Sequence, residues 1–348
     1  MNELHIIDKG KTILDALAQL NKMAPGPLVL FVIDKMGAMV GTLTDGDIRR
    51  ALISGTPLQD SVEKAMHKEF KYIAEAEENR VLKVRELKKK NIKLIPVLDS
   101  DSHIVEIINL FRCKSQLPID AVIMAGGKGE RLRPLTEKTP KPLLKVGHKA
   151  IIDYNVENLV LHGIKHISVT VNYLKEQIEE HFTEPIKGVK VETVREPKYL
   201  GTMGSVQFVQ NFHNDTILVM NSDLFTNIDL EDFYLHFKKY NADMSVAAVP
   251  YSVKVPYGIF KIEDQRDITG IAEKPSYNYY ANGGIYLIKR SVLEEFVPKE
   301  TFFNATDLIE KLIAEKRKVI RFPISGYWID IGNKQEYEKA NDMVGHIH

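Results

Sequence analysis

The sequence is poor in cysteine, because its 348 residues contain only one, Cys113. A single cysteine excludes an intramolecular disulfide and a metal site built from several thiolates, and it is typical of proteins that fold in a reducing compartment. The sequence also lacks an apolar run approaching the ~20 residues that cross a bilayer, and it lacks an N-terminal secretory signal. These absences favour a cytoplasmic protein that does not contact a membrane.

Net charge is absent as well, because 47 basic residues balance 47 acidic ones. A neutral chain argues against binding nucleic acid or an anionic membrane over its whole surface, so any electrostatic attraction must be local. Hydrophobic residues make up 44% of the sequence and charged residues 27%, which leaves enough apolar mass for packed cores. The length exceeds that of one typical domain of ~150 residues and predicts two or more domains.

The first third of the chain contains an internal repeat. Residues 28–43 have the pattern of two β-rich runs joined by a short turn. Counted from Val32, the same pattern returns 65 positions later, at residues 97–108, and each copy follows a helix-like segment. We interpret residues 1–116 as one domain made of two copies, about residues 1–58 and 59–116.

The first copy continues into a Thr-x-x-Asp segment, Thr44 to Asp47, at the expected start of a helix. This segment resembles that of cystathionine β-synthase (CBS) domains, whose paired modules often bind an adenine nucleotide. The resemblance implies an α+β CBS pair over residues 1–116 in which Thr44 and Asp47 hold the ribose. The same two residues match a capping box, so a purely structural or dimerising role stays open. The second copy has Asn109 and Arg112 at these positions, which argues against a second nucleotide site.

Pro118 interrupts the apolar pattern and marks a boundary between two domains, residues 1–116 and 118–348. Beyond it, short β-rich runs alternate with amphipathic segments, beginning with a buried strand at residues 119–125 and a helix at 151–162. Such alternation predicts a Rossmann-like α/β fold, with a mixed, mostly parallel sheet flanked by helices. In such folds ligands bind at the carboxyl ends of the strands.

A glycine-rich loop follows the first of these strands and includes Ala125, Gly126, Gly127 and Gly129. Glycines let backbone N–H groups approach an anion closely, and the downstream Arg131 and Lys141 can supply charge-assisted contacts to phosphate oxygens. Between Gly126 and Lys149, seven basic residues and two acidic ones leave a local charge of +5. The Walker A and dinucleotide-binding patterns are both absent. The loop therefore predicts that the chain binds a polyphosphate.

The order Gly-Gly-x-Gly-x-Arg-Leu-x-Pro-Leu-Thr, followed by Pro-Lys-Pro-Leu-Leu, resembles the signature of sugar-1-phosphate nucleotidyltransferases, the NDP-sugar pyrophosphorylases. Further landmarks of this family recur in order through residues 119–340. The resemblance implies a GT-A-like nucleotidyltransferase domain. It implies nucleotide contacts from the glycine-rich loop and from Arg131, Lys141, Leu200, Gly201, Thr202 and Asp223.

On the sugar side, the resemblance implies contacts from Gly258, Glu273, Lys274, Asn282 and Gly283. It assigns Asp223 and Asp330 to Mg²⁺, the one cofactor expected, since carboxylate oxygens suit this hard cation. The family usually has Gly-Asp where this chain has Ser222-Asp223. The implied catalytic residues are Arg131, Lys141, Asp223, Lys274 and Asp330.

These assignments predict an enzyme that transfers a nucleotidyl group from a nucleoside triphosphate to a hexose-1-phosphate and releases pyrophosphate. Residues 200–204, Leu-Gly-Thr-Met-Gly, most resemble mannose-1-phosphate guanylyltransferases. We therefore expect GTP with mannose-1-phosphate or a related sugar or amino-sugar phosphate, and UTP or dTTP is the alternative.

The expected partners are these two substrates, an adenine nucleotide at the CBS pair, which would regulate the enzyme, and further copies of the chain in a homo-oligomer. No nucleic acid or membrane partner is expected. A catalytically silent CBS nucleotide sensor and a ligand-free CBS scaffold are alternatives of other classes. The joint presence of the five implied catalytic residues argues against a silent domain.

Overall fold

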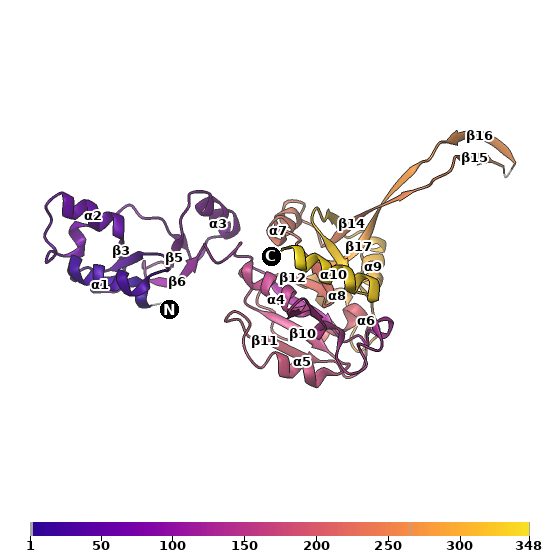
Figure 1. Cartoon of the computed structure of the whole chain (residues 1–348), viewed down its shortest axis with the longest axis horizontal. Coiled ribbons are helices and arrows are strands. Elements are labelled where there is room, and N and C mark those ends of the chain that lie inside the picture. Colours follow the sequence, from indigo (N-terminus) through magenta and orange to yellow (C-terminus); the bar gives the residue numbers. More distant parts are fainter. Residues whose placement is uncertain (1–2, 265, 348) are drawn as a thin grey trace. The chain divides into compact units, whose positions relative to one another are not determined.

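The computed structural model describes residues 3–264 and 266–347, and the chain divides into two compact units, Met1–Gln116 and Leu117–His348. Figure 1 labels the helices and strands of both units. Within the described residues, no helix is long and apolar enough to span a membrane.

The first unit contains two three-stranded sheets that share one topology. In each sheet a short first strand pairs in parallel with the second, which then pairs antiparallel with the third. The strands are β1 (Ile6–Asp8), β2 (Val29–Ile33) and β3 (Met39–Thr44) in one sheet, and β4 (Ile73–Ala74), β5 (Leu94–Leu98) and β6 (Ile104–Asn109) in the other. The helices are α1 (Ile13–Met23), α2 (Asp45–Ile53) and α3 (Arg80–Lys89).

Apolar residues of β2 and β3 pack against α1 and form a hydrophobic core beside the first sheet. Leu30, Val32 and Leu43 are fully buried there with Ile13 of α1. Thr12 caps α1, because its side chain accepts a hydrogen bond from the Asp15 N–H while the Asp15 carboxylate accepts one from the Thr12 N–H. This capping box fixes where the helix begins.

The second unit is built on a seven-stranded sheet with the order β11-β10-β7-β12-β17-β14-β18. All neighbouring strands are parallel except that β17 is antiparallel to both β12 and β14. This arrangement confirms the predicted α/β fold with a mixed, mostly parallel sheet. The strands are β7 (Asp120–Ala125), β10 (Ile167–Val171), β11 (Val191–Arg195), β12 (Thr216–Asn221), β14 (Met244–Lys254), β17 (Ser276–Lys289) and β18 (Val319–Pro323).

Helices flank this sheet, and the apolar residues between them form its main core. Val122 of β7, Val219 of β12 and Ile288 of β17 are fully buried against Leu308 of α9 and Phe296 of α8. The helices are α4 (Ile151–Leu161), α5 (Lys175–His181), α6 (Gly201–Gly204), α7 (Leu230–Lys239), α8 (Arg290–Phe296), α9 (Ala305–Ala314) and α10 (Lys334–Ile347).

Two small antiparallel sheets lie beside the main one and form a second apolar cluster with α4 and α10. They pair β8 (Lys145–Val146) with β9 (Lys149–Ala150), and β13 (Leu224–Thr226) with β19 (Trp328–Asp330). Phe225 and Ile329 from the second pair pack with Ile151 and Val344 in this cluster.

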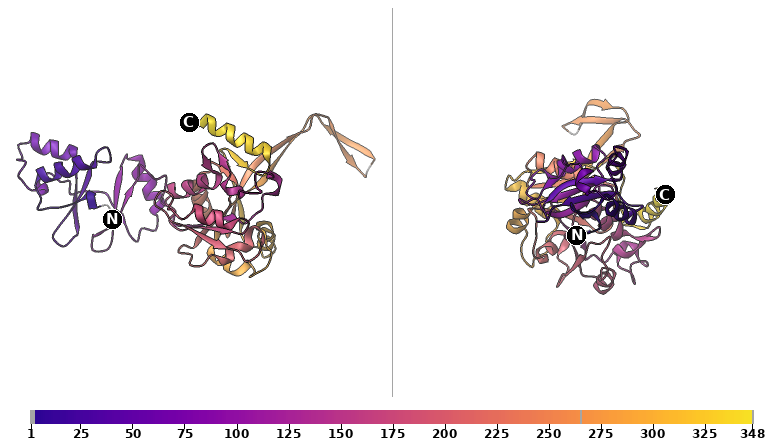
Figure 2. Two further views of the ribbon diagram at one scale, coloured as in Figure 1. Left: turned by 60° about the horizontal axis from the view of Figure 1, so that its bottom comes forward. Right: turned by 90° about the vertical axis from the view of Figure 1, so that its left-hand side faces the viewer.

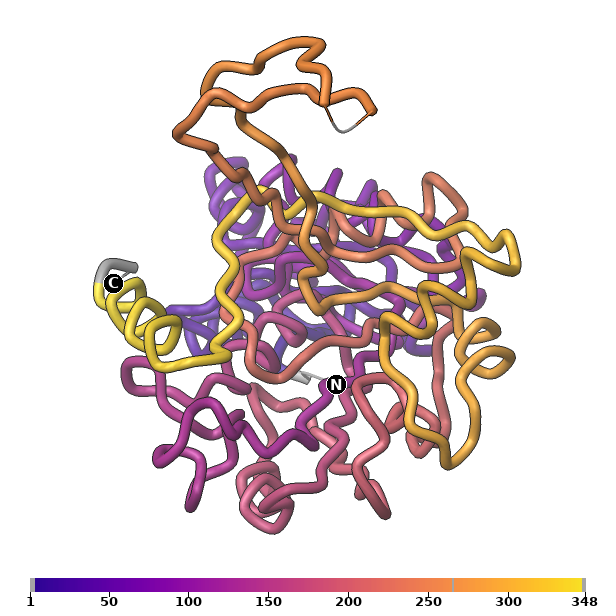
Figure 3. The backbone as a smooth tube through the Cα atoms, turned by 90° about the vertical axis from the view of Figure 1, so that its right-hand side faces the viewer, coloured from indigo at the N-terminus to yellow at the C-terminus, as the bar shows by residue number. Residues whose placement is uncertain are grey.

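Two strands of the main sheet continue past its edge as a two-stranded ribbon. In the part of the chain that the structure describes, β14 pairs with β18 over Met244–Ala248, and from Val249 to Lys254 it pairs with β17 alone. A hairpin of β15 (Ile259–Glu263) and β16 (Asp267–Ala272) follows at the far end. We call residues 249–281 the arm. It projects from the rest of the second unit in Figure 1 and in both views of Figure 2, and Figure 3 shows it in orange.

Candidate active site

The glycine-rich loop leaves the carboxyl end of β7, a strand that is buried at every position. Ala125 and Gly126 are buried, whereas Gly127 is exposed and can present its backbone to a ligand. Gly129 has φ +63, a conformation that side chains disfavour, and a Cβ there would lie 3.1 Å from Cβ of Lys141. The loop therefore needs glycine at this position in order to pack against the segment that carries Lys141.

Asp223 and Asp330 lie far apart in the sequence, and the structure brings them together. Asp223 lies two residues after the end of β12 and directly precedes β13, and Asp330 ends β19. β13 and β19 pair antiparallel with Leu224 opposite Asp330, and the Ile331 N–H donates to the Asp223 carbonyl oxygen at 3.1 Å. The pairing of the two short strands is thus what places both carboxylates at the carboxyl end of β12.

Lys141 and Arg131 stand beside these carboxylates. Nζ of Lys141 forms an ion pair with Oδ2 of Asp223, and both side chains are largely buried. A Cβ on Gly332 would lie 3.4 Å from the Arg131 guanidinium, next to Asp330. Four of the five predicted catalytic residues are therefore close to one another, around the glycine-rich loop.

The electrostatics of the carboxylate pair favour a cation. Burial raises the pKa of Asp330, the nearby Asp223 raises it further, and Lys141 and Arg131 oppose this rise. Among the described residues, Oδ1 of Asp223 is buried without a hydrogen-bond partner. A buried carboxylate oxygen needs a partner, and two carboxylates with an unsatisfied oxygen match the oxygen ligands that Mg²⁺ prefers. The residues present therefore fit the implied Mg²⁺ site.

The predicted nucleotide loop at Leu200, Gly201 and Thr202 forms the start of α6 and is held by the segment before α9. Gly201 has φ +80, and a Cβ on it would lie 2.8 Å from the carbonyl oxygen of Phe303. The side chain of Thr202 accepts a hydrogen bond from the Ala305 N–H at 2.9 Å. Only glycine fits at position 201, and the loop is rigidly positioned.

Glu196 is a site residue that the sequence did not single out. Only 4% of it is exposed, and burial raises its pKa from 4.5 to about 7. Its Oε2 accepts the Leu200 N–H at 3.2 Å, and a Cβ on Gly126 would collide with its Oε1. Glu196 thus connects the glycine-rich loop to the nucleotide loop. In the sequence Glu196 stands out only as the acidic residue directly before Pro197, at the start of the segment that leads to Leu200.

The predicted sugar-side residues fall into two groups. Gly258, Glu273 and Lys274 lie on the arm, where a Cβ on Gly258 would be 3.1 Å from the Glu273 carboxylate and where Glu273 and Lys274 are exposed. Asn282 and Gly283 lie where the arm joins the sheet, and the Gly283 carbonyl oxygen accepts a hydrogen bond from the Trp328 indole at 2.9 Å. The structure therefore joins Gly283 to β19, the strand that ends at Asp330, and it places the first group on the projecting ribbon.

Comparison with known proteins identifies the family. A sequence model described as nucleotidyl transferase matches residues 120–346. The "Bifunctional protein GlmU" of Methanococcus maripaludis strain C5 is 31% identical over 231 residues, which cover 64% of this chain and 54% of that protein. The chain belongs to the nucleotidyl transferase family.

Two further relatives extend the comparison. The D-glycero-alpha-D-manno-heptose 1-phosphate guanylyltransferase of Aneurinibacillus thermoaerophilus is 27% identical over 66% of this chain and 99% of its own length. A Bacillus anthracis crystal structure described as a glucose-1-phosphate thymidylyltransferase is 26% identical, with a TM-score of 0.52 over 66% of this chain and 96% of that one. This nucleotidyl transferase spans about half the length of the GlmU relatives that it matches.

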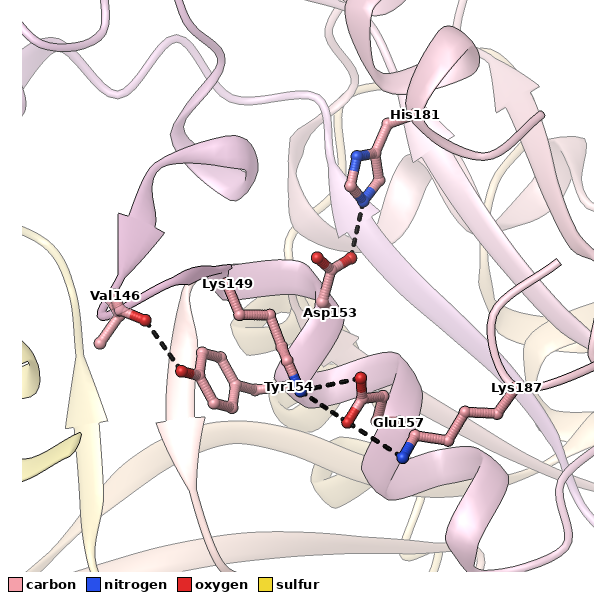
Figure 4. A network of polar contacts seen from close by, with 7 residues as sticks. All are labelled: Val146, Lys149, Asp153, Tyr154, Glu157, His181 and Lys187. Carbon is pink, nitrogen blue, oxygen red and sulfur yellow. Dashed lines mark hydrogen bonds and ion pairs between the residues drawn. The ribbon is translucent and has the colours of Figure 1, made fainter. Parts of the chain in front are cut away.

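The local charge of +5 overstates the number of cations available to a ligand of this nucleotidyl transferase. Lys141 is paired with Asp223, and Nζ of Lys149 lies 2.8 Å from both carboxylate oxygens of Glu157 on α4. Figure 4 shows this second pair with the neighbouring Tyr154, whose hydroxyl donates to the Val146 carbonyl oxygen at 2.8 Å. Lys149 and Tyr154 thus hold the β8–β9 hairpin on α4, so Lys149 has a structural role.

A separate cluster lies at the opposite end of β7 from the glycine-rich loop. Asp120, His166 and His213 each offer a ligand atom within 4.8 Å of the others. The two imidazole rings are stacked at 3.6 Å with planes 9° apart, so their in-plane lone pairs cannot meet at one ion unless a ring turns. The Asp120 carboxylate already accepts hydrogen bonds from Asn214. Imidazole nitrogens also suit transition metals rather than Mg²⁺, so this cluster is not the predicted metal site.

In the first unit, Thr44 and Asp47 form the capping box at the start of α2. Oγ1 of Thr44 lies 2.5 Å from Oδ2 of Asp47, whose carboxylate also accepts the Thr44 N–H at 2.8 Å. Asp47 pairs in addition with Arg50. Both side chains therefore have the local structural role that the sequence left open.

Proposed function

We propose that the chain is a sugar-1-phosphate nucleotidyltransferase, which joins a nucleoside triphosphate to a sugar-1-phosphate and releases pyrophosphate. The observation that carries the proposal is the meeting of Asp223 and Asp330 with Lys141 and Arg131 beside the glycine-rich loop. Family membership and the names of the two further relatives support the same reaction class.

In the proposed reaction an oxygen of the sugar phosphate attacks the α-phosphorus of the triphosphate in line. The bond from the α-phosphorus to the bridging oxygen of the β-phosphate breaks, and pyrophosphate leaves with that electron pair. Reactions of this kind depend on positioning and on charge stabilisation and need no covalent nucleophile. Exposed backbone N–H groups of the glycine-rich loop bind the phosphates, and Arg131 and Lys141 balance their negative charge.

Asp223 and Asp330 would hold Mg²⁺, which when bound neutralises phosphate charge. In the structure, Lys141 forms an ion pair with Asp223. Neutralising Asp223 would free Lys141 but remove the carboxylate that orients it. We therefore expect Asp223→Asn to lower turnover about a hundredfold or more, the loss typical of one charge-stabilising contact. Asp342→Asn on α10, an exposed aspartate, is the matched control and should keep wild-type turnover.

We propose GTP as the nucleotide and mannose-1-phosphate or a related hexose or amino-sugar phosphate as the acceptor. The loop at residues 200–204 and the guanylyltransferase relative support GTP. The thymidylyltransferase relative supports the alternative of UTP or dTTP. Pyrophosphate release from GTP, ATP, UTP and dTTP with each of several sugar-1-phosphates tests the assignment, and a clear preference for UTP or dTTP would replace GTP.

We propose further that residues 1–116 form a CBS pair that binds an adenine nucleotide at Thr44 and Asp47 and regulates the transferase domain at 118–348. The repeated sheet topology supports the pairing. Turnover of the full chain should change on titration with AMP and should stop responding in Asp47→Ala. If AMP does not bind and does not change turnover, the CBS pair would be a structural or dimerising module. Tight AMP binding without turnover on any triphosphate would instead make the protein a silent nucleotide sensor.

A further inference from the structure

The arm exposes an unusual amount of apolar surface for a ribbon that contacts little else. Six aromatic side chains on it, Tyr251, Tyr257, Phe260, Tyr277, Tyr279 and Tyr280, are 41–73% exposed. Ile262 and Ile268 on its terminal hairpin are 61% and 60% exposed. A two-stranded ribbon in water is at best marginally stable, and its unpaired edges invite another chain. The arm therefore has the character of a segment that is covered in the working protein.

The exposed area is large enough for a stable protein interface. Taking about 200 Å² for each aromatic side chain, the exposed fractions of the six aromatics amount to roughly 700 Å². A standard interface buries about 800 Å² on each partner, and the largest apolar patch on an ordinary monomer is about 300–600 Å². The isoleucines of the hairpin add to this area. Tyr251, Tyr277 and Tyr279 share one face of the ribbon and Tyr280 lies on the other, so a partner would have to contact both faces of the arm to cover this area.

The residues on the arm indicate what covers it. Gly258 lies against Glu273, and Lys274 follows with φ +45, a backbone conformation that a lysine adopts at a cost of about 1 kcal/mol or more. In the proposed function these three residues contact the sugar phosphate. The phosphate-binding loop and the Asp223–Asp330 pair belong to the sheet, from which the arm projects (Figures 1 and 2). The glycine, the carboxylate and the ammonium group on the arm would contact a sugar phosphate bound at the edge of the sheet that carries the phosphate-binding loop. Because the arm projects from its own sheet, we identify the edge that it covers as that of another copy of the chain.

We propose that the chain works as a two-fold dimer in which the arm of each copy covers the active site of the other. Each site would combine Arg131, Lys141, Asp223 and Asp330 of one chain with Gly258, Glu273 and Lys274 of its partner. A two-fold axis makes the exchange reciprocal, so both sites are completed and both arms are covered. The ammonium group of Lys274 would then face the sugar phosphate beside the Asp223–Asp330 pair. This inference deepens the proposed function and rests on it.

A mixed dimer tests the exchange directly. Lys274→Ala removes the arm's ammonium group and Asp223→Asn removes the sheet's carboxylate, and each homodimer should lose turnover by about a hundredfold or more. The two variants are co-expressed with different affinity tags, and the mixed dimer is isolated through both tags. One of its two sites then has a native sheet and a native arm, so turnover should recover to about half the wild-type value per dimer. If the arm acted within its own chain, the mixed dimer would stay inactive, and the inference would be wrong.

Two controls make each outcome decisive. A mixed dimer of Lys274→Ala with Glu273→Ala carries two defective arms and should stay inactive, which excludes recovery by refolding or contamination. Light scattering tests assembly without activity: Ile262→Ser with Ile268→Ser should shift the chain toward monomer, whereas Ile313→Ser on α9, 61% exposed in the wild type, should not.

The failure of this inference differs from the failure of the proposed function. A wild-type chain that turns over as a monomer, or an active wild type with a silent mixed dimer, overturns the exchanged arm and leaves the reaction in place. A wild-type dimer that depends on the arm but turns over no triphosphate leaves the arm as an interface and removes the reaction, and with it the shared site.

Discussion

Glu196 provides the sharpest quantitative prediction, because its carboxyl group is buried between the two loops that would hold the nucleotide. Burial raises its pKa from 4.5 to about 7, and a single backbone N–H, that of Leu200, partly offsets the rise. A difference of about 2.5 pKa units at 1.36 kcal/mol each corresponds to about 3 kcal/mol of folding free energy. Glu196→Gln keeps the shape and an oxygen that can accept the Leu200 N–H, but it removes the charge.

The direction of the effect follows from proton binding. Below pH 4.5 the carboxyl group is protonated in the folded and unfolded chains alike and contributes no pH dependence. Between pH 4.5 and about 7 the unfolded chain loses this proton while the folded chain keeps it, so stability falls as pH rises. Above about pH 7 the folded chain holds a buried charge and the full loss of about 3 kcal/mol is reached. Glu196→Gln should therefore be more stable than wild type at pH 8 and about equally stable at pH 4.5.

Urea unfolding at several pH values measures this difference. Trp328 is the one tryptophan of the chain and lies in the second unit, so its fluorescence reports unfolding of the unit that contains Glu196. Other titrating groups act equally on both proteins and cancel in the difference. Glu192→Gln, at an exposed position on β11, removes the same charge from the surface and is the matched control, expected to stay within about 0.5 kcal/mol of wild type. A difference between Glu196→Gln and wild type that stays constant from pH 5 to pH 8 would refute the buried, proton-holding carboxyl group.

Three further predictions address the remaining parts of the chain. Gly201→Ala forces a Cβ to within 2.8 Å of a backbone oxygen at φ +80 and should raise KM for the triphosphate about tenfold or more. Gly188→Ala has a similar φ of +84 but open space around the Cβ, so it should cost only about 1 kcal/mol of stability. Equal effects of the two variants in steady-state kinetics and in urea unfolding would contradict this packing argument. Asp330→Asn should lower turnover about a hundredfold while the circular dichroism spectrum is unchanged, and excess Mg²⁺ should not restore it; full turnover would remove Asp330 from the site. Thr44→Ala should lower the thermal stability of the first unit by about 1 kcal/mol through loss of the capping box, as Thr12→Ala should at α1, and calorimetry that detects no shift for either would contradict the capping role.

Local patterns in the sequence were sufficient to predict the elements that depend on neighbouring residues. The buried strand expected at residues 119–125 is β7, Asp120–Ala125, and the helix expected at 151–162 is α4, Ile151–Leu161. A continuous apolar run and an amphipathic period determine such elements without help from distant parts of the chain. The capping box at Thr44 was visible for the same reason, since its two partners are three residues apart.

Features that depend on distant residues could not be derived from local patterns. The contact between Asp223 and Asp330 exists because β13 pairs with β19, and it was expected only through the family resemblance. The pKa of Glu196 depends on burial by two loops. The charge count treated Lys149 as available to a phosphate, but Glu157 on α4 neutralises it. The arm was not predicted either, because the alternation of β14 continues past Ala248 with no sign that its neighbour β18 ends there.

The hydrogen bond from Trp328 to Gly283 links the base of the arm to the strand that carries Asp330. β19 is only three residues long, yet Trp328 at its start donates to the Gly283 carbonyl oxygen at 2.9 Å and Asp330 at its end stands beside Asp223. The base of the arm and the carboxylate pair are therefore joined through one short strand. In the exchanged dimer the arm of each chain serves its partner's site, so this strand connects the Asp330 of one site to the arm that completes the other. Trp328→Phe keeps an aromatic ring but loses the indole hydrogen bond, so we expect it to raise KM for the sugar phosphate more than KM for the triphosphate. Equal changes in the two constants would mean that Trp328 serves only the packing of β19.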